Sequence, residues 1–362
     1  MSSINVTESR AYTGPLDLAR PDILALEPYS HASWEPSLER LHANELPWRA
    51  DNDSTSAGLN RYPEPQPREL VERLAALYDV PASMVLVGRG SDEAIDLLTR
   101  GFCRAGQDNI VILPPTFGMY SVAARIQGAD VIRVPLRADQ DFALDERAVL
   151  AACTLNTKLV YLCSPNNPTA NLMDEATMLR LAAALEGRAL LVVDEAYIEF
   201  ADVPSLARAI PKYPHIAILR TLSKAHAMAG ARCGVLIATP EIVTLLRKVI
   251  PPYAMTQMTI ETVLKQLEPA ELVVSRARIQ TIRQERERIS RALKESTAVI
   301  KVWPSATNFL LVEFHAPDEA IAHTRSAGLL IRDVRSQPGL GRALRISVGT
   351  PEQNDRLIGA LR

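Results

Sequence analysis

Apolar runs of four to six residues recur along the chain from about residue 61, and segments with helical spacing separate them. The runs are Met84–Val87, 109–113, 158–163, 189–194 and 215–220. Continuous apolar runs of this length are typical of strands that are buried on both faces. Their alternation with helical segments predicts βαβ units, so we expect an α/β fold with a mostly parallel central sheet flanked by helices.

The pattern changes after about residue 255. Segment 273–295 is highly charged, yet its apolar residues fall close to helical spacing, which predicts one long amphipathic helix. Shorter apolar runs follow it at 308–314, 328–333 and 343–349. We therefore predict a large domain over residues 61–255 and a smaller α+β domain over residues 256–362, preceded by an irregular N-terminal segment (residues 1–60).

Composition and charge exclude several classes of protein. The 362 residues are enough for about two domains, and the 47% apolar and 23% charged content is typical of a globular chain. The net charge of −2 gives no electrostatic case for a nucleic-acid partner. No apolar run approaches the roughly 18 residues of a membrane span, and the first residues are polar, so we expect neither membrane insertion nor export.

The four cysteines form no CxxC pair and no metal-ligand spacing. Such thiols are typical of a reduced protein, so we expect a cytoplasmic location and no metal site. Lysine is scarce, with seven in the whole chain, which leaves few candidates for lysine chemistry.

Polar clusters follow the predicted strands, at the edge where open α/β sheets bind ligands. The first is the sequence GRGSD, which places Ser91 and Asp92 between a strand and a helix. Unpaired backbone N–H groups at a helix start favour an anion such as phosphate. An ordinary helix cap would use the same residue types, so this motif alone does not decide between the two.

The segment TLSKAHAMAGAR carries Lys224 next to Ser223, with Arg232 eight residues further on. A lysine at this edge of a sheet can form an imine with a carbonyl cofactor. The neighbouring hydroxyl and guanidinium can hold the phosphate of that cofactor. A solvated loop lysine is the alternative interpretation.

Three further residues suit a flat pyridine ring. Asp194 ends an apolar strand, where a carboxylate can keep a pyridine nitrogen protonated. Asn167 in SPNNPT can hydrogen-bond a ring substituent, and Phe117 in PPTFGMY can stack on the ring. A helix cap, a turn asparagine and a core aromatic are the corresponding structural alternatives.

Arginines near the C-terminus suit an anionic substrate. In ALRISVG, Arg345 lies on the face opposite Leu344 and Ile346, which leaves its guanidinium available to a carboxylate or phosphate. Arg332, after the preceding apolar run, can join it; either could instead be an ordinary surface arginine. We interpret all these clusters as one pyridoxal-phosphate site, because together they supply partners for the ring, the aldehyde and the phosphate.

The motifs RYPEPQP, VGRGSDEAIDLL, CSPNNPT, VVDEAYIEF and RTLSKAHAMAGARCG resemble those of the fold-type I, class II pyridoxal-phosphate aminotransferases. Among these, the sequence is most similar to the histidinol-phosphate aminotransferases, and the similarity covers nearly the whole chain. It implies the fold-type I architecture, pyridoxal phosphate as cofactor, and a homodimer. The implied reaction converts L-histidinol phosphate and 2-oxoglutarate to imidazole-acetol phosphate and L-glutamate in histidine biosynthesis.

The resemblance also implies roles in catalysis and cofactor binding. Lys224 would be the Schiff-base lysine, Asp194 the partner of the pyridine nitrogen, and Tyr197 a donor to the 3-oxygen of the cofactor. Other residues would bind the ring or the phosphate of the cofactor: Ser91, Asp92, Phe117, Asn167, Ser223 and Arg232.

The substrate and partner-subunit residues follow from the same resemblance. Tyr62 of RYPEP would reach the cofactor in the partner's site, with residues 1–60 packing against the small domain and the partner subunit. Arg345 would bind the anionic end of the substrate. Three residues would assist it: Tyr29, Asn44 and Arg332.

Three positions depart from the family pattern. Ala170 replaces the usual glycine after SPNNPT, Leu46 replaces asparagine in NENP, and His226 replaces phenylalanine after the lysine. None of the three belongs to the implied cofactor set.

Other functions remain as alternatives. Within the same fold, an aromatic amino-acid aminotransferase and a phospho-amino-acid decarboxylase use similar motifs. A non-catalytic cofactor-binding domain is disfavoured because Lys224 and Asp194 are both present. A nicotinamide dehydrogenase is disfavoured because Glu93 stands where the third glycine of its fingerprint should be.

Overall fold

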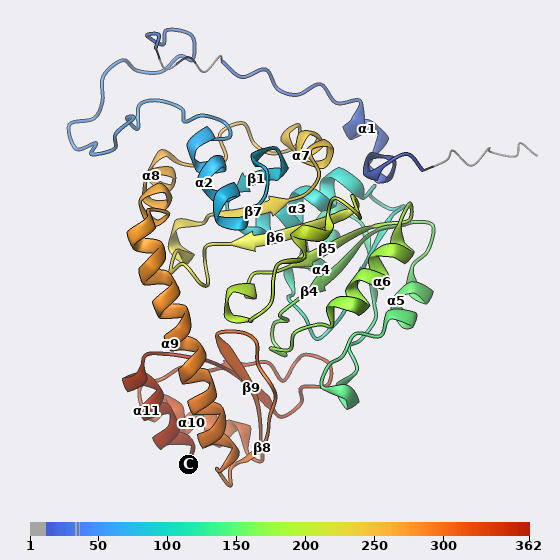
Figure 1. The fold of residues 1–362 in the computed structure, drawn as a ribbon, viewed down its shortest axis with the longest axis vertical. Helices are drawn as coiled ribbons and strands as arrows, with labels where there is room; N and C mark the ends of the chain where they lie inside the picture. The colour runs from blue at the N-terminus through green and yellow to red at the C-terminus, as the bar shows by residue number, and fades with distance from the viewer. Residues whose placement is uncertain (1–11, 33–34, 36) are drawn as a thin grey trace, which may run out of the picture.

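The computed structural model describes residues 12–32, 35 and 37–362. The first eleven residues, on which the expectation of no export signal rested, lie outside the described residues. The N-terminal segment runs along one edge of the molecule (Figure 1) and includes a short 3-10 helix, η1 (Pro15–Leu18), and a single helical turn, α1 (Pro21–Leu24).

The large domain is built on a seven-stranded sheet in the order β1-β7-β6-β5-β4-β2-β3. Neighbouring strands are parallel except that β7 runs antiparallel to both β1 and β6. The strands are β1 (Val85–Gly88), β2 (Asn109–Ile112), β3 (Asp130–Arg133), β4 (Thr157–Cys163), β5 (Leu190–Asp194), β6 (Ile216–Thr221) and β7 (Gly234–Ile237).

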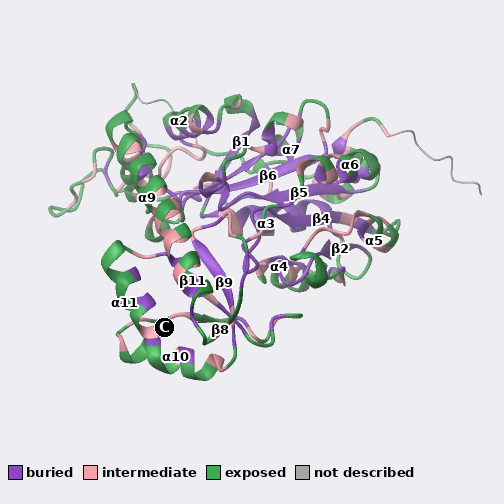
Figure 2. Cartoon of the chain, turned by 60° about the horizontal axis from the view of Figure 1, so that its bottom comes forward, coloured by how far each residue is buried: buried purple, intermediate pink, exposed green. Residues whose placement is uncertain are grey.

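Helices cover both faces of this sheet. On one face lie α3 (Ser91–Phe102), α4 (Met119–Gln127) and α7 (Pro240–Arg247); on the other lie α2 (Arg68–Tyr78), α5 (Glu146–Ala152), α6 (Glu175–Leu185) and α8 (Gln257–Gln266). Successive side chains of each central strand therefore enter different cores. In β5, Leu190 and Val192 pack on the α3 side, whereas Leu191 and Val193 pack on the α6 side. Figure 2 shows the central strands buried beneath these helices.

The smaller domain begins with a long helix that spans both domains (Figure 1). Its elements are α9 (Pro269–Lys294), β8 (Val299–Val302), β9 (Phe309–Phe314), α10 (Pro317–Ser326), β10 (Arg332–Asp333), β11 (Ala343–Ser347) and α11 (Pro351–Leu361). The strands form an antiparallel sheet in the order β10-β11-β9-β8. Ile289 and Leu293 of α9 are fully buried against this sheet, as the helical spacing predicted.

The α/β class and the central parallel sheet are confirmed, with some local corrections. Segment 328–333 is a strand only at its last two residues, where β10 pairs with β11. The stretches after β5 and β6 form only 3-10 turns, η4 (Ile198–Phe200) and η6 (Ala229–Ala231), instead of the expected helices. After β5, carboxylate side chains accept hydrogen bonds from backbone N–H groups in place of helical carbonyl groups. Asp194 accepts from the N–H of Ala196, and Glu195 accepts from the N–H of Leu206.

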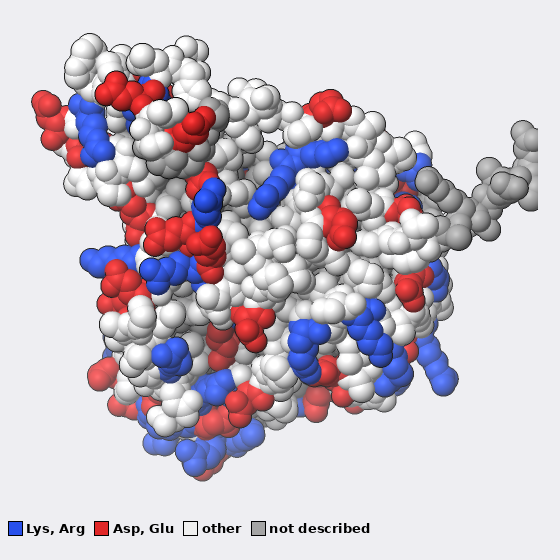
Figure 3. All heavy atoms as spheres, turned by 45° about the horizontal axis from the view of Figure 1, so that its top comes forward, with Lys and Arg blue, Asp and Glu red and all other residues white. Residues whose placement is uncertain are grey.

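The surface carries both signs of charge. On the face drawn in Figure 3, acidic and basic side chains lie close together around broad uncharged areas. Within the described part of the chain, the helices are too short or too polar to cross a membrane.

Candidate active site

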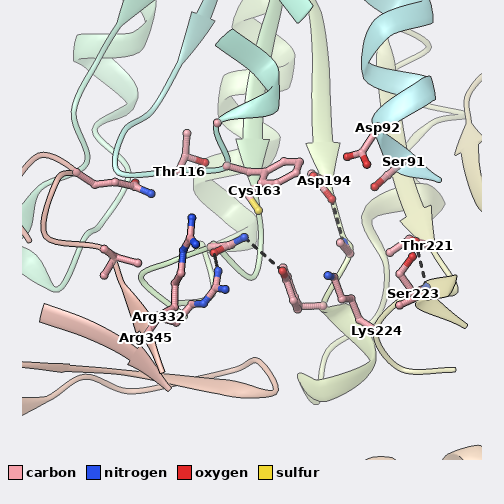
Figure 4. Close-up of a pocket in the computed structure, with 18 of the residues that line it drawn as sticks. Ser91, Asp92, Thr116, Cys163, Asp194, Thr221, Ser223, Lys224, Arg332 and Arg345 are labelled. Carbon is pink, nitrogen blue, oxygen red and sulfur yellow. Dashed lines mark hydrogen bonds between the residues drawn. The ribbon is translucent and has the colours of Figure 1, made fainter. Parts of the chain in front are cut away.

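A cavity of about 560 Å³ lies between the large sheet and the β10–β11 edge of the small sheet. Because β1, β2, β4, β5 and β6 run in the same direction, the loops that leave them all open toward this edge. The antiparallel β7 begins at the same edge and therefore brings Arg232 there from the opposite direction. Eleven of the expected site residues line this cavity: Ser91, Asp92, Phe117, Asn167, Asp194, Tyr197, Ser223, Lys224, Arg232, Arg332 and Arg345 (Figure 4).

Asp194 ends β5 on the cavity wall and is only 2% exposed. The hydroxyl of Tyr120 donates to its Oδ2 at 2.7 Å, and the backbone N–H of Ala196 donates to its Oδ1 at 3.0 Å. Burial nevertheless raises the pKa of Asp194 to about 6, because these two donors only partly replace water around the carboxylate. A cationic ring nitrogen in the cavity would therefore stabilise the carboxylate strongly.

A chain of hydrogen bonds connects the small sheet to the end of β5. Arg345 Nη1 donates to Asn167 Oδ1 at 2.6 Å, and Asn167 Nδ2 donates to Tyr197 Oη at 3.3 Å. Tyr197 packs edge-on against Phe309, and burial raises the pKa of its hydroxyl. The hydroxyl proton of Tyr197 is thus retained at neutral pH and can be donated to an oxygen in the cavity.

Lys224 lies in the turn that follows β6, with its Nζ 5.8 Å from the centre of the Tyr197 ring. Partial burial and the nearby Arg345 guanidinium lower the pKa of Lys224. A lowered pKa increases the fraction of neutral amine, which is the nucleophilic and basic form.

The opposite end of the cavity is suited to a phosphate. Helix α3 begins there at Ser91, where the first-turn N–H groups of a helix have no helical partners. Arg232 Nη1 lies 3.4 Å from Ser223 Oγ, and its Nη2 donates to Asp92 Oδ2 at 3.2 Å. The turn before α3 uses Gly90 at φ +93°, and a Cβ on Gly90 would lie 2.7 Å from Arg232 Nη2.

These residues suit pyridoxal phosphate. The cavity has a volume typical of small-molecule sites and presents an amine, a buried carboxylate and a helix start with serine and arginine beside it. The buried Nε of Arg345 has no hydrogen-bond partner within the described chain, so this guanidinium retains donor capacity for an anion. Among the described residues, no group of three or more His, Cys, Asp or Glu side chains is arranged to hold a metal ion.

Three predicted residues lie outside the cavity of their own chain. Tyr62 is half exposed and stacks on Tyr253 at 4.5 Å, while Tyr29 contacts His31, which in turn contacts Tyr253. Asn44 is exposed on the same N-terminal segment. The single chain therefore leaves Tyr29, Asn44 and Tyr62 away from its Lys224.

The three departures from the family pattern have different surroundings. Ala170 is fully buried at φ +65°, a backbone conformation that favours the glycine usual at this position. Leu46 is 69% exposed, so its side chain has little contact within the chain. His226 is buried, and this burial lowers its pKa.

Sequence reasoning missed several residues that the structure places at the site. Thr116, Cys163, Ser336 and Gln337 line the cavity, and Tyr120 lies directly behind Asp194. Tyr120 lies in the first turn of α4, and the sequence gives no signal that its hydroxyl reaches Asp194.

Together, the fold and the cavity are those of an α/β enzyme that uses pyridoxal phosphate, with a strand-end carboxylate and a lysine lining one cavity. The profile of the family described as aminotransferase class I and II matches residues 40–361. A solved histidinol-phosphate aminotransferase from Sinorhizobium meliloti, in complex with pyridoxal-5'-phosphate, is 27% identical with a TM-score of 0.75. That comparison covers 83% of this chain and 82% of the other.

Two relatives with higher sequence identity identify the family within this class. The histidinol-phosphate aminotransferase of Stenotrophomonas maltophilia is 46% identical over 356 residues, and that of Xanthomonas euvesicatoria is 46% identical over 351 residues. Each comparison covers 96% of both chains. The chain belongs to the histidinol-phosphate aminotransferase family.

Proposed function

We propose that this protein is a pyridoxal-phosphate-dependent transaminase of histidine biosynthesis. It would interconvert L-histidinol phosphate and 2-oxoglutarate with imidazole-acetol phosphate and L-glutamate. The observation that carries this proposal is the placement of the Lys224 amine and the buried Asp194 carboxylate on one cavity, with the phosphate-binding turn at its end. When bound, the cofactor supplies a carbonyl carbon that bonds to amines and a ring that accepts electrons.

Lys224 would hold the cofactor covalently and then act as the base. Once free of the cofactor, its Nζ would serve as the base that carries the proton from the substrate α-carbon to C4′. The lowered pKa of Lys224 suits this role, because a base must be neutral to accept a proton. Asp194 would keep the ring nitrogen protonated, and Tyr197 with Asn167 would donate to the 3-oxygen.

Arg345 would bind the anionic end of each substrate. A guanidinium presents a planar pair of N–H donors that matches a phosphate and a carboxylate equally well. It can therefore hold histidinol phosphate in one half-reaction and glutamate in the other. Arg332 lines the same end of the cavity and would add a second positive charge.

An absorbance spectrum tests both half-reactions. The protein mixed with pyridoxal phosphate should show a visible band, which L-histidinol phosphate alone should replace with near-ultraviolet absorption. Addition of 2-oxoglutarate should then restore the visible band. A protein that binds the cofactor but responds only to aromatic amino acids would be an aromatic aminotransferase, and the histidinol-phosphate assignment would be wrong.

We further propose that the active enzyme is a homodimer in the cytoplasm. The N-terminal segment exposes large apolar side chains that a second copy would cover, including Leu41 at 90% and Trp48 at 77% exposure. Tyr62 and Tyr29, which lie outside their own cavity, could then reach the cavity of the partner. All four cysteines are free thiols, in keeping with a reducing compartment.

Mixed dimers test this exchange. Lys224→Ala and Tyr62→Ala subunits should each give low activity alone. When the two are refolded together, one site of each mixed dimer receives an intact Lys224 and an intact partner tyrosine, so activity should recover. No recovery, in a sample shown by sedimentation to contain mixed dimers, would contradict a shared site.

A further inference from the structure

Tyr120 is buried behind the cavity and touches Asp194, the carboxylate assigned to the ring nitrogen of the cofactor. Its hydroxyl donates to Asp194 Oδ2 at 2.7 Å, and the side chain is fully buried. Its burial and the neighbouring carboxylate raise the pKa of Tyr120 well above its ordinary value, so the hydroxyl remains a proton donor. Nothing in the chemistry of Lys224 or Arg345 requires this tyrosine.

The ring of Tyr120 is held rigidly on two sides. It stacks on Tyr161 at 4.7 Å with an interplanar angle of 12°, and it meets the ring of Phe117 edge-on at 5.7 Å. Tyr161 is fixed in turn by its own hydroxyl, which donates to the Ile95 carbonyl at 3.3 Å. Tyr120 therefore cannot move away from Asp194 without disturbing a packed aromatic stack.

Tyr120 and Ala196 together fix the orientation of the Asp194 carboxylate at the cavity wall. Each carboxylate oxygen can accept two hydrogen bonds, and each has one acceptor position filled, Oδ2 by Tyr120 and Oδ1 by the Ala196 N–H. The positions that remain can accept a proton donor from the cavity. The two donors also stabilise the negative form of the carboxylate, which burial opposes.

We propose that Tyr120 is a positioning residue for the transamination reaction: it holds Asp194 ionised and fixes its orientation toward the ring nitrogen of the cofactor. This inference rests on the proposed function, since it requires a pyridine ring in the cavity. Phe117, the residue expected to stack on that ring, is packed against the same tyrosine. Tyr120 thus contacts both Asp194, assigned to the ring nitrogen, and Phe117, expected to stack on the ring face.

The test compares Tyr120→Phe with Tyr161→Phe. Both variants keep an aromatic ring in the stack and lose one buried hydroxyl, but only Tyr120→Phe removes a donor to Asp194. We expect Tyr120→Phe to weaken pyridoxal-phosphate affinity and lower kcat by about 10- to 100-fold, the range for a hydrogen bond to a charged group. KM should change much less, and Tyr161→Phe should stay within about twofold of the parent.

Two readouts separate positioning from packing. With ¹⁵N-labelled pyridoxal phosphate, the NMR shift of the ring nitrogen should move toward the unprotonated value in Tyr120→Phe alone. With the 1-deaza analogue, which has carbon in place of that nitrogen, Tyr120→Phe should bind as well as the parent.

Each outcome decides the question. Equal losses with both cofactors, equal effects of the two variants, or an unchanged nitrogen shift would overturn the role of Tyr120. Failure of the parent protein to bind pyridoxal phosphate at all would instead overturn the proposed function.

Discussion

Replacing Asp194 with asparagine should stabilise the cofactor-free protein at neutral pH while removing most of the turnover. Burial raises the pKa of this carboxyl from 3.8 to about 6 in the folded protein. Because the folded value exceeds the unfolded one, the contribution to stability is fully present below pH 3.8 and is lost as the pH rises through 6. At neutral pH, ionising the buried group costs about 3 kcal/mol.

Asparagine carries no charge at any of these pH values. The stability of Asp194→Asn relative to the parent should therefore increase with pH, by about 1.4 kcal/mol between pH 5 and pH 7.5. In a chain of this size that difference corresponds to about 2 °C in Tm. Turnover should fall in the same variant, because asparagine cannot hold a pyridine nitrogen in its protonated form.

Thermal unfolding of the two cofactor-free proteins across this pH range is the assay. Asp92→Asn is a matched control, since it removes a more exposed carboxylate from the same cavity, where water already solvates the charge. With pyridoxal phosphate added, the parent should have a higher Tm than Asp194→Asn, because the parent gains a cationic partner for Asp194. A Tm difference that stays constant from pH 5 to pH 7.5 would refute the reasoning.

Three further substitutions test other parts of the protein. Lys224→Ala should abolish turnover while pyridoxal phosphate still binds, as equilibrium dialysis would show. Arg220→Met should destabilise the fold by about 3–5 kcal/mol in denaturant unfolding. The reason is that Arg220 is buried and bonds Glu199 at 2.8 Å and Glu195 at 3.4 Å. Arg345→Ala should lower kcat/KM for both substrates about 100-fold, measured by steady-state kinetics, with cofactor affinity unchanged.

The contrary results are equally specific. Measurable transamination by Lys224→Ala would remove the lysine from the mechanism. An Arg220→Met variant as stable as the parent would mean that Glu195 and Glu199 do not need this guanidinium to remain buried. A loss confined to one substrate in Arg345→Ala would assign the other anion to a different residue, with Arg332 the first to test.

The residues at strand ends could be predicted because sheet topology dictates where they meet. Asp194, Asn167 and Lys224 each follow a buried apolar strand, and parallel strands bring such positions to one edge. The polar face predicted for the last apolar run includes Arg345, and this side chain lines the cavity.

Other features depend on contacts between distant segments. The antiparallel strand β7 carries no sequence signal of its direction, although that direction brings Arg232 beside Asp92. Tyr120 looks like a core residue in the sequence, and only the packing of α4 against the sheet brings its hydroxyl to Asp194. In the proposed homodimer, the places of Tyr29, Asn44 and Tyr62 depend on the second subunit, so one chain alone does not bring them to a site.

The cavity lies between two sheets, and the residues that each sheet contributes have different proposed roles. The residues assigned to the cofactor come from the large sheet, whereas Arg332 and Arg345 arrive on paired strands of the small one. Changes at these two arginines could therefore alter which anionic group is bound, while the residues assigned to the cofactor stay the same. Descent with such piecemeal revision would let one ancestral scaffold give rise to enzymes for many amino donors.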